Sequence, residues 1–276
     1  MLKFKFKLHS VVLLAFGLVL SVSSCSDEDE VEDFSAVTAA AKTGSTSNTN
    51  SPWDTNSSYS SSDYFQVDND GGSGDGAHNW NESDWDSSPS NNGFNIRTYC
   101  YGEGSDAIIT CPSNGIRAEY RDVTNIDLDK KNKQDFTFSI GDYDNEHELI
   151  MAQLHNDASG VERPYLTISA EDGTIYFKRS DDFIKDSETT TSGNTLTYRT
   201  NDRYRIKMDS ESGDRSVFCK VWNLDTGESE SNTWSFDSSW NSKDGSFYWK
   251  HGIYMPDGGS DNTYMRVESV TFSTNQ

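Results

Sequence analysis

The sequence predicts an all-β domain, because short runs of alternating apolar and polar residues dominate it and no long stretch of the mature chain has helical spacing. Such runs include Phe136–Ile140 and Leu166–Ala170, and a turn cluster at Glu171–Gly173 follows the second of them. Further runs of this kind are Ile175–Phe177, Leu196–Tyr198, Tyr204–Ile206 and Val217–Cys219. Repeated short strands without helices indicate a sandwich, a jelly roll or a barrel.

The composition supports a folded core and excludes one class of partner. Aromatic residues make up 12% of the 276 residues, whereas disordered chains carry few of them. The chain has 45 acidic and 23 basic residues, which gives a formal net charge of −22. Because phosphate binding needs a basic face, we expect no nucleic-acid partner. The length is typical of one β-domain with appendages, and we expect a monomer.

The first 24 residues have the pattern of a signal peptide. Basic residues precede a short apolar run from Val11 to Leu20, and small residues follow it. That run is too short for a membrane-spanning helix, which needs about 20 apolar residues. The exit Val22-Ser23-Ser24-Cys25 resembles the lipobox of bacterial lipoproteins, which implies that Cys25 is lipidated. An ordinary signal peptide with an incidental cysteine is the alternative.

Residues 25–62 predict a solvated tether. Six acids occupy the seven positions from Asp27 to Asp33, and such a run does not fold on itself. The acidic run also resembles the export signal of surface lipoproteins in some Gram-negative bacteria. It implies a lipid anchor in the outer membrane and exposure at the cell surface. Between Ser35 and Ser62, 14 of 28 residues are Ser or Thr, which favours a flexible linker. We therefore place the folded domain at residues 63–276.

Three cysteines remain in the exported part, where disulfides persist. Cys100 and Cys111 flank a short loop and are predicted to form a disulfide, whereas Cys219 lies in an apolar strand and is expected to be a buried thiol. Their spacing does not match a zinc site. The acidic stretch Asp68–Gly76 offers oxygen ligands for a structural calcium ion, with a solvated loop as the alternative.

Three predicted strands carry polar residues that packing alone does not require. Arg117, Glu119 and Arg121 alternate along the first strand and therefore share one face. In the second, Gln153 and His155 share a face with Met151, while Ile150, Ala152 and Leu154 are expected to face the core. In the third, Tyr248, Lys250, Gly252 and Tyr254 share a face, and the glycine lets a ligand approach the backbone.

Together these segments resemble the motifs of polysaccharide lyase family 7, the alginate lyases, in the order that the family has them. The pattern Arg-x-Glu-x-Arg is matched at 117–121, Gln-Ile/Val-His at 153–155, and Tyr-x-Lys-x-Gly-x-Tyr at 248–254. The departures are Leu154, Tyr120 and His251, where the family usually has a β-branched residue, Leu and Ala, and the lack of a Gln soon after Tyr254. The resemblance implies an antiparallel β-sandwich of jelly-roll type with a concave substrate groove.

The resemblance also implies a reaction, β-elimination on a uronate polymer such as alginate. Arg117 and Gln153, with help from His155, would bind the uronate carboxylate and stabilise the enolate-like charge. Tyr254 would supply the acid, and Tyr254 or His155 the base, according to the stereochemistry of the sugar. Arg121, Lys250, Tyr248 and Glu119 would bind and orient the substrate. Nearby cations would lower the pKa of Tyr254. The scheme requires no cofactor and no metal.

Two other functions remain open at this stage. A glycoside hydrolase would need two placed carboxylates, for which Glu82–Asp86 is the nearest candidate. A noncatalytic carbohydrate-binding lipoprotein would use exposed tryptophans, with Trp80, Trp85, Trp222 and Trp240 as candidates. Glucuronan or ulvan could replace alginate as the substrate of a lyase. Because the substrate is a polyanion, a lyase also requires an acidic body with one basic groove, formed by Arg117, Arg121 and Lys250, with Lys178 and Arg179 as further candidates.

Overall fold

The computed structural model of the chain describes residues 50–68, 78–91, 94–111, 117–184, 187–211, 213–256 and 262–276. The predicted signal peptide, Cys25 and residues 26–49 of the predicted tether lie outside the described residues. So does the proposed calcium loop, apart from Asp68. Within the described ranges, no helix is both long and apolar enough to cross a membrane.

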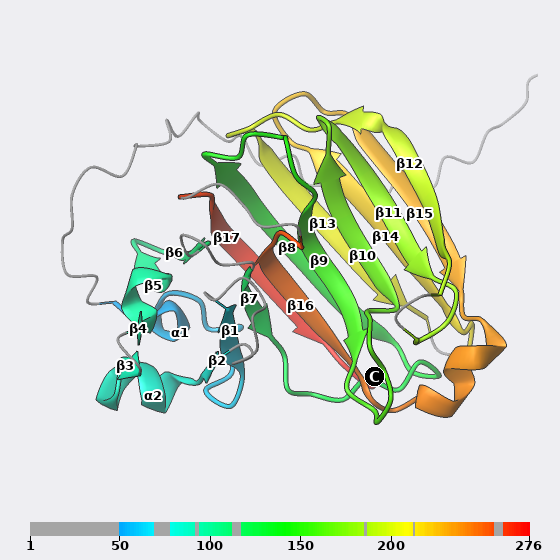
Figure 1. Cartoon of the computed structure of the whole chain (residues 1–276), viewed down its shortest axis with the longest axis horizontal. Helices are drawn as coiled ribbons and strands as arrows, with labels where there is room; N and C mark the ends of the chain where they lie inside the picture. The colour runs from blue at the N-terminus through cyan, green and yellow to red at the C-terminus, as the bar shows by residue number, and fades with distance from the viewer. Residues whose placement is uncertain are drawn as a thin grey trace, which may run out of the picture. The chain divides into compact units, whose positions relative to one another are not determined.

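Two antiparallel sheets face each other in a sandwich (Figure 1). In the described chain, the larger sheet has eight strands in the order β12 (Thr189–Thr197), β11 (Thr174–Ser180), β10 (Leu166–Glu171), β9 (Leu149–Asn156), β16 (Phe247–Tyr254), β7 (Arg117–Arg121), β1 (Tyr64–Asp68) and β2 (His78–Trp80). The second has seven, in the order β15 (Ser229–Ser235), β14 (Ser216–Asn223), β13 (Arg203–Ser210), β8 (Asn132–Gly141), β17 (Tyr264–Ser273), β6 (Asp106–Thr110) and β5 (Cys100–Glu103). The all-β sandwich prediction is confirmed.

The core lies between the two sheets and is filled by alternate residues of each strand. Phe136, Phe138 and Ile140 of β8 are buried there, as are Ile206 and Met208 of β13. The neighbouring positions point outward, so the period-two pattern of the sequence sets the two faces of each strand. The predicted turn at Glu171–Gly173 closes the β10–β11 hairpin. Its residues Asp172 and Gly173 both have positive φ, as a two-residue hairpin turn requires.

The helical elements are short and lie outside the sheets. They are α1 (Pro52–Thr55), α2 (Glu82–Ser87) and the 3₁₀ turns η1 (Ile96–Thr98) and η2 (Ser238–Lys243), and a small ribbon pairs β3 (Ser90–Asn91) with β4 (Phe94–Asn95). The acids proposed for a glycoside hydrolase form α2. Asn81 caps this helix and Asp84 closes the capping box, while Trp85 is buried. Asp84 thus has a local structural role.

The predicted boundary between tether and domain at residue 63 is wrong. Residues 50–62 are part of the folded body, because Trp53 and Tyr59 are both only 5% exposed and belong to the core. The ring of Trp53 meets Phe65 edge to face, with the centroids 5.1 Å apart, and its indole N–H donates to the carbonyl of Ser60. The polar composition of the segment hid these two aromatic anchors.

This N-terminal segment, residues 51–63, packs against the core-facing side of β7 and β16 and is called the strap below. The Tyr59 hydroxyl lies 3.0 Å from Nε2 of His251 on β16, and the hydroxyl of Tyr120 on β7 donates to the Asp63 carboxylate. Tyr120 and His251 are themselves a cross-strand pair, with ring centroids 5.0 Å apart. Burial lowers the pKa of His251 to about 3, so the imidazole is neutral. The strap therefore supplies partners for two polar core residues.

The predicted disulfide between Cys100 and Cys111 is also wrong, since the structure holds both residues as thiols. In the β5–β6 hairpin Cys100 pairs with Ile109, so Cys111 lies two positions past the residue opposite Cys100. Such diagonal neighbours are about 7–8 Å apart, farther than the Cβ separation of a disulfide. Cys219 is a buried free thiol, as expected.

If the strap belongs to the core, Trp53→Ala will lower the free energy of unfolding by about 3–5 kcal/mol, because it leaves a large cavity. Trp222→Ala is the matched control. Trp222 is half-buried on an outer sheet face, and its removal is expected to cost about 1 kcal/mol or less. Urea unfolding of the two full-length variants measures both values. Equal losses would show that residues 51–63 do not stabilise the sandwich.

Candidate active site

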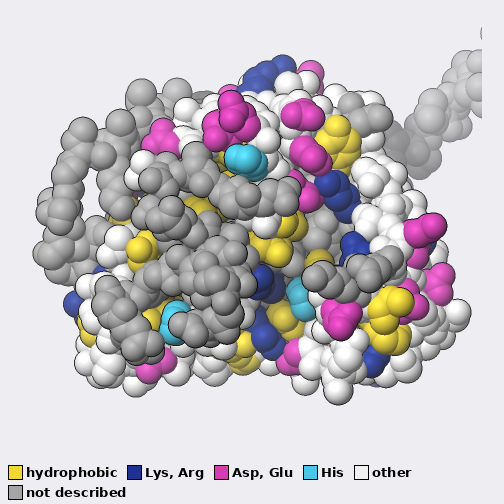
Figure 2. Space-filling model, in the orientation of Figure 1, with side chains coloured by type: hydrophobic (Ala, Val, Ile, Leu, Met, Phe, Trp, Pro, Cys, Tyr) yellow, Lys and Arg dark blue, Asp and Glu magenta, His cyan; other side chains and the backbone are white. Residues whose placement is uncertain are grey.

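The three predicted motif strands are neighbours in the larger sheet, although they are far apart in the sequence. β16 lies between β9 and β7, and β1 follows β7. Lys250 is opposite both Gln153 and Arg121, while Tyr254 is opposite Arg117. The motif residues therefore form one patch on the face of this sheet that points away from the core. Figure 2 shows blue cationic side chains and a cyan histidine gathered near the middle of this hollowed face.

A glycine makes the close approach of β7 and β16 possible. Gly252 is opposite Glu119, and its φ of 145° is one that other residues rarely adopt. A Cβ at this position would lie 2.5 Å from the carbonyl oxygen of Ala118 and 2.7 Å from Cα of Glu119. Gly252 therefore brings the two strands together where Glu119 must reach its partners.

Glu119 is the centre of a buried polar network. Nζ of Lys250 donates to one of its carboxylate oxygens at 2.5 Å, and the side-chain amide of Gln153 donates to the other. Nζ of Lys250 also donates to Oε1 of Gln66, at 2.9 Å. Glu119, Gln153 and Lys250 are each 1% exposed. Burial lowers the pKa of Lys250 to about 8, although the Glu119 carboxylate acts in the opposite direction.

The two arginines of β7 flank this network. Arg117 donates to Gln66 at 3.3 Å, and its guanidinium lies over the ring of Tyr254, 4.5 Å from the centroid. The guanidinium of Arg121 lies 3.8 Å from the ring centroid of Tyr248. Each of the two guanidinium groups is thus held against a tyrosine of the third motif. Cations over aromatic faces are attracted by the ring quadrupole, which fixes both arginines at the groove surface.

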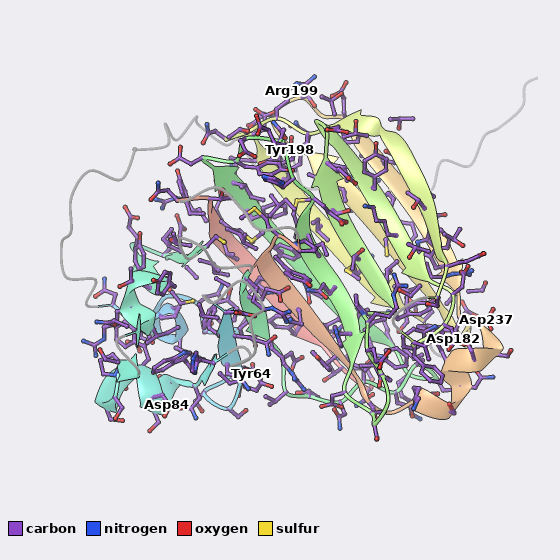
Figure 3. The ribbon with its side chains drawn as sticks, in the orientation of Figure 1. Tyr64, Asp84, Asp182, Tyr198, Arg199 and Asp237 are labelled. Carbon is purple, nitrogen blue, oxygen red and sulfur yellow. The ribbon has the colours of Figure 1, made fainter. Side chains whose placement is uncertain are left out.

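The outer edge of the site adds two residues beside Arg121. Nη2 of Arg121 pairs with Asp157 at 2.7 Å, and its guanidinium lies 5.2 Å from the ring centroid of Tyr64. Tyr64 is on β1 and is labelled in Figure 3, far from Tyr198 and Arg199 at another edge of the sandwich. Asp157 offsets the charge of Arg121. Arg117, in contrast, forms no ion pair with any acid in the described part of the chain.

Accessibility divides the predicted site residues into two groups. Arg117, Arg121, His155 and Tyr254 are half-buried and have surface that a substrate can contact. The other four residues that were predicted to act on or bind the substrate are nearly fully buried. They are Glu119, Gln153, Tyr248 and Lys250. In this structure the buried four hold the accessible four in position.

His155 is neutral and stacked. Its ring lies on Tyr248 with the centroids 5.3 Å apart, and its Nδ1 is within hydrogen-bond distance of both the N–H and the carbonyl of Asn156. Burial, together with the positive charges of Lys250, Arg121 and Arg117, lowers the pKa of His155 to about 3. The imidazole is therefore unprotonated at neutral pH, and one of its ring nitrogens has a lone pair.

The expectation that cations lower the pKa of Tyr254 is wrong in its net direction. Burial of the phenol raises the pKa above its ordinary value, and this effect outweighs the opposing effect of Arg117. Tyr254 is therefore protonated at neutral pH. A protonated phenol is suited to donate a proton rather than to accept one.

A β-bulge in β9 reverses the predicted orientation of Met151 and Ile150. Ala152 is opposite Ile168, but the next paired residue on β9 is Ile150, opposite Ser169, so Met151 is the extra residue. As a result Met151 joins the core, whereas Ile150 lines the groove and is opposite Tyr254. The same irregularity appears on β16 between His251 and Tyr254. Bulges commonly re-aim side chains next to active sites.

The groove continues from Tyr254 across β9 to β12. A hollow of about 370 Å³ is lined there by side chains that include Ile150, Thr167, Lys178, Thr191 and Tyr254. Lys178 lies between Glu148 and Glu171, at 2.8 and 2.9 Å, so its charge is offset. The expectation that Arg179 joins the basic groove is wrong, because Arg179 pairs with Asp181 and lies over Trp234 of the other sheet. Arg121 and Lys250 are likewise paired, with Asp157 and Glu119, so among these cations Arg117 is the one without an assigned ion pair to a described acid.

The chain was compared with known proteins in three ways. No family model matches it, and no curated protein is detectably similar. Among solved structures, alginate lyase A1-II', a member of polysaccharide lyase family 7, superposes with a TM-score of 0.61. The superposition covers 82% of this chain and 99% of that one at 14% sequence identity. The chain has the fold of the family 7 polysaccharide lyases.

Other solved alginate lyases have the same fold. The enzyme from Klebsiella pneumoniae superposes with a TM-score of 0.57 at 10% identity, over 81% of this chain and 98% of that one. An alginate lyase from Pseudomonas aeruginosa gives 0.57 at 14% identity, over 78% and 100%. The chain therefore spans nearly the full length of each of these lyase-fold structures.

Residues 64–68 contribute to the site although the sequence did not single them out. Gln66 of β1 accepts hydrogen bonds from both Lys250 and Arg117, and Tyr64 lies beside Arg121. A lone glutamine in a short strand gives no sequence signal. Only the pairing of β1 with β7, which puts Gln66 opposite Glu119, reveals its role.

Two groups of side chains in the described chain have the spacing of metal ligands. They are Asp144, Glu146 and His147, and Asp127, Asp129 and Asp244. The second group already binds a cation, because Arg215 pairs with Asp129 and Asp244 at 2.9 and 3.1 Å. Neither group includes a residue of the candidate site.

The close contact at Gly252 leads to a test of the site geometry. Gly252→Ala will force β7 and β16 apart and displace Glu119, so we expect a loss of about 3 kcal/mol or more in the free energy of unfolding. Gly173→Ala is the matched control. It also has positive φ but no atom within 4 Å of its added Cβ, and it should cost about 1 kcal/mol. Equal losses for the two variants in urea would mean that the strands are not in contact at Gly252.

Proposed function

We propose that the protein is a polysaccharide lyase that cleaves a uronate-containing polymer, with alginate as the first candidate, by β-elimination. The observation that carries this proposal is that Arg117, His155 and Tyr254 lie half-buried on the same outward face of the sheet, on three neighbouring strands that are distant in sequence. The lyase fold and the family motifs support the same proposal. Three of the four tryptophans considered for a purely binding protein, Trp80, Trp85 and Trp240, are buried, which argues against that alternative.

The first step is neutralisation of the uronate carboxylate. The proton on the adjacent carbon becomes acidic only when the carboxylate charge is offset, and positioned cations and hydrogen-bond donors do this without reorganisation. Arg117 is the accessible cation nearest to Tyr254, and Gln66 and the Tyr254 ring hold it in place. Gln153 is buried and donates to Glu119, so it supports the site from below.

Two proton transfers complete the elimination. Tyr254, which burial keeps protonated, donates its phenolic proton to the leaving glycosidic oxygen. Neutral His155 accepts the proton from the carbon next to the carboxylate, when the sugar presents that proton to its side of the groove. For the opposite stereochemistry, Tyr254 would have to lose its own proton to solvent before it could act first as base and then as acid. The bond between the glycosidic oxygen and the β-carbon breaks, and a carbon–carbon double bond forms.

A panel of uronate polymers tests both the reaction and the substrate. The protein should be incubated with alginate, glucuronan and ulvan while ultraviolet absorbance of the conjugated product is followed. An increase with one polymer identifies the substrate. No increase with any of the three would refute the lyase proposal.

We further propose that the enzyme acts at the cell surface of a Gram-negative bacterium, held to the outer membrane by lipid on Cys25. The lipobox-like exit and the acidic run that follows support this location. A lipid anchor through Cys25 would keep the groove near the membrane without requiring a membrane-spanning segment.

Replacing the proposed acid should separate catalysis from binding. Tyr254→Phe removes only the hydroxyl, so turnover is expected to fall by about a thousandfold while the polymer still binds. Tyr176→Phe is the matched control, because Tyr176 is on β11 of the same sheet but outside the motif strands. Initial rates and binding of the uncut polymer are measured for both variants. A Tyr254→Phe protein with normal turnover would show that another group is the acid.

The pH dependence of kcat/KM follows from the shifted pKa values of two groups in the site. His155 has a folded pKa of about 3, so activity should persist well below pH 6.5, where an ordinary histidine becomes protonated. On the alkaline side, Lys250 loses its proton as the pH rises through about 8, and the groove loses a positive charge. Activity should fall there. Lys250→Arg keeps the charge and is expected to move this fall to higher pH.

Lys131→Arg is the control for that substitution, since Lys131 is exposed and pairs only with Glu211 in the described chain. Its pH profile should match that of the wild type. A fall in activity near pH 6.5 in the wild type would contradict the assignment of a neutral, buried His155.

A further inference from the structure

Three strands of the second sheet, β8, β13 and β14, have an outer face whose charge is opposite to that of the whole chain. Basic residues outnumber acidic ones on that face of the three strands, with Lys133, Arg203, Arg205, Lys207 and Lys220 against Asp135 and Asp209. These side chains alternate with core residues and lie next to one another across the strands. In the whole chain, acids outnumber bases by 45 to 23. The face is therefore a basic patch on an acidic protein.

An aromatic side chain lies at the centre of this patch. Trp222 of β14 is half-buried on the outer face, unlike the three core tryptophans named above. Nζ of Lys220 lies 4.4 Å from its ring centroid and the guanidinium of Arg205 lies 5.1 Å from it. Phe218, two residues before Lys220, has Nζ of Lys207 at 5.8 Å. Two outward aromatic rings are thus each accompanied by cations.

Part of the positive charge is not offset. Asp135 is shared between Arg205, at 2.9 Å, and Lys133, at 3.1 Å, so one acid serves two cations. Lys207 pairs with Asp209 at 2.6 Å, and Arg203 pairs with Glu268 of β17 at 2.5 Å, so these two cations are offset. Lys220 forms no ion pair with any acid in the described part of the chain, and its only assigned contact is with the Trp222 ring. An anion approaching Trp222 therefore meets a net positive field.

A row of exposed hydroxyl groups borders the aromatic side chains. On the edge strand β15, Ser229 is opposite Trp222, Ser231 is opposite Lys220, and Thr233 is opposite Phe218. All three are exposed. Hydroxyls both donate and accept hydrogen bonds, which matches the hydroxyl groups of a sugar. The patch thus combines a ring for the apolar face of a sugar, cations for its acid groups and hydroxyls for its rim.

We propose that the outer face of β13, β14 and β15 is a second, noncatalytic binding surface for an anionic polysaccharide, centred on Trp222 and Lys220. The choice of ligand class rests on the proposed function, since a surface of this charge would hold the same kind of polymer that the groove cleaves. Two sites on one protein that bind one long polymer raise its avidity without any new contact in the groove. The surface has too few apolar side chains for the core of a stable protein interface.

The test uses the Tyr254→Phe protein, which should bind polymer without cutting it. In this background, Trp222→Ala and Lys220→Gln are each expected to weaken binding to long polymer by roughly tenfold, equivalent to about 1.4 kcal/mol. Lys131→Gln removes the same charge from an exposed position outside strands β13, β14 and β15, and should change the affinity less than twofold. Affinity electrophoresis in gels that contain alginate, glucuronan or ulvan gives the values. A short oligosaccharide that fills only the groove should be affected less than the polymer.

The outcomes separate this proposal from the lyase proposal. Polymer binding that depends on Trp222, in a protein that cleaves nothing, would support the surface and refute the lyase. Cleavage with polymer binding unchanged in both Trp222→Ala and Lys220→Gln would refute the surface alone. Binding of the patch to vesicles that contain anionic lipid, in place of polymer, would also refute it. Circular dichroism of each variant establishes that the sandwich is intact before binding is compared.

Discussion

The buried contact between Glu119 and Lys250 organises the candidate site. Both side chains are 1% exposed, and two charges removed from water are tolerated only when their geometry is good and their other hydrogen bonds are satisfied. Gln153 donates to the carboxylate and Gln66 accepts from the ammonium, so residues from four adjacent strands form one network. Removal of one partner from such a pair leaves an uncompensated charge and commonly costs about 3–5 kcal/mol. The network therefore holds strands β9, β16, β7 and β1 in one register.

This rigidity gives the accessible groups their roles. Arg117 is directed by Gln66 from one side and by the Tyr254 ring from the other, so it cannot turn away from the groove without losing both. His155 is held against Tyr248, which in turn lies under Arg121. Preorganised dipoles and charges stabilise developing charge because they do not have to reorient during the reaction. The buried residues of the motifs thus act through the half-buried ones.

Much of the fold followed from the period-two pattern, because the core residues of β8, β10, β11 and β13 alternate strictly with polar ones. The same rule placed Glu119 and its neighbours on one face. It failed at Met151, since a bulge depends on how two strands pair and leaves no mark in either strand alone. It also could not tell buried from accessible polar residues on that face, which is why Lys250 and Gln153 were expected to contact substrate.

The amino-acid composition of a segment led to a wrong prediction where one or two residues determine how the whole segment packs. Residues 50–62 are rich in serine and threonine, yet Trp53 and Tyr59 alone anchor the segment in the core. The sign of the pKa shift of Tyr254 depends on burial, which the sequence does not report, and burial here outweighs the effect of the adjacent arginine. Likewise, the spacing of Cys100 and Cys111 suggested a loop closed by a disulfide, but the hairpin register separates them.

The strap also determines which residues would have to be included if this domain were transplanted into another protein. Tyr120 and His251 occupy positions where the family motifs usually have leucine and alanine, and both depend on Tyr59 and Asp63 for their hydrogen bonds. A lyase domain with apolar residues at these positions would lack partners for the strap, and the strap would not pack well against it. The smallest unit that could be transplanted into another protein therefore begins before Ser51. Its N-terminal segment and the strands that carry the motifs have to be transferred together.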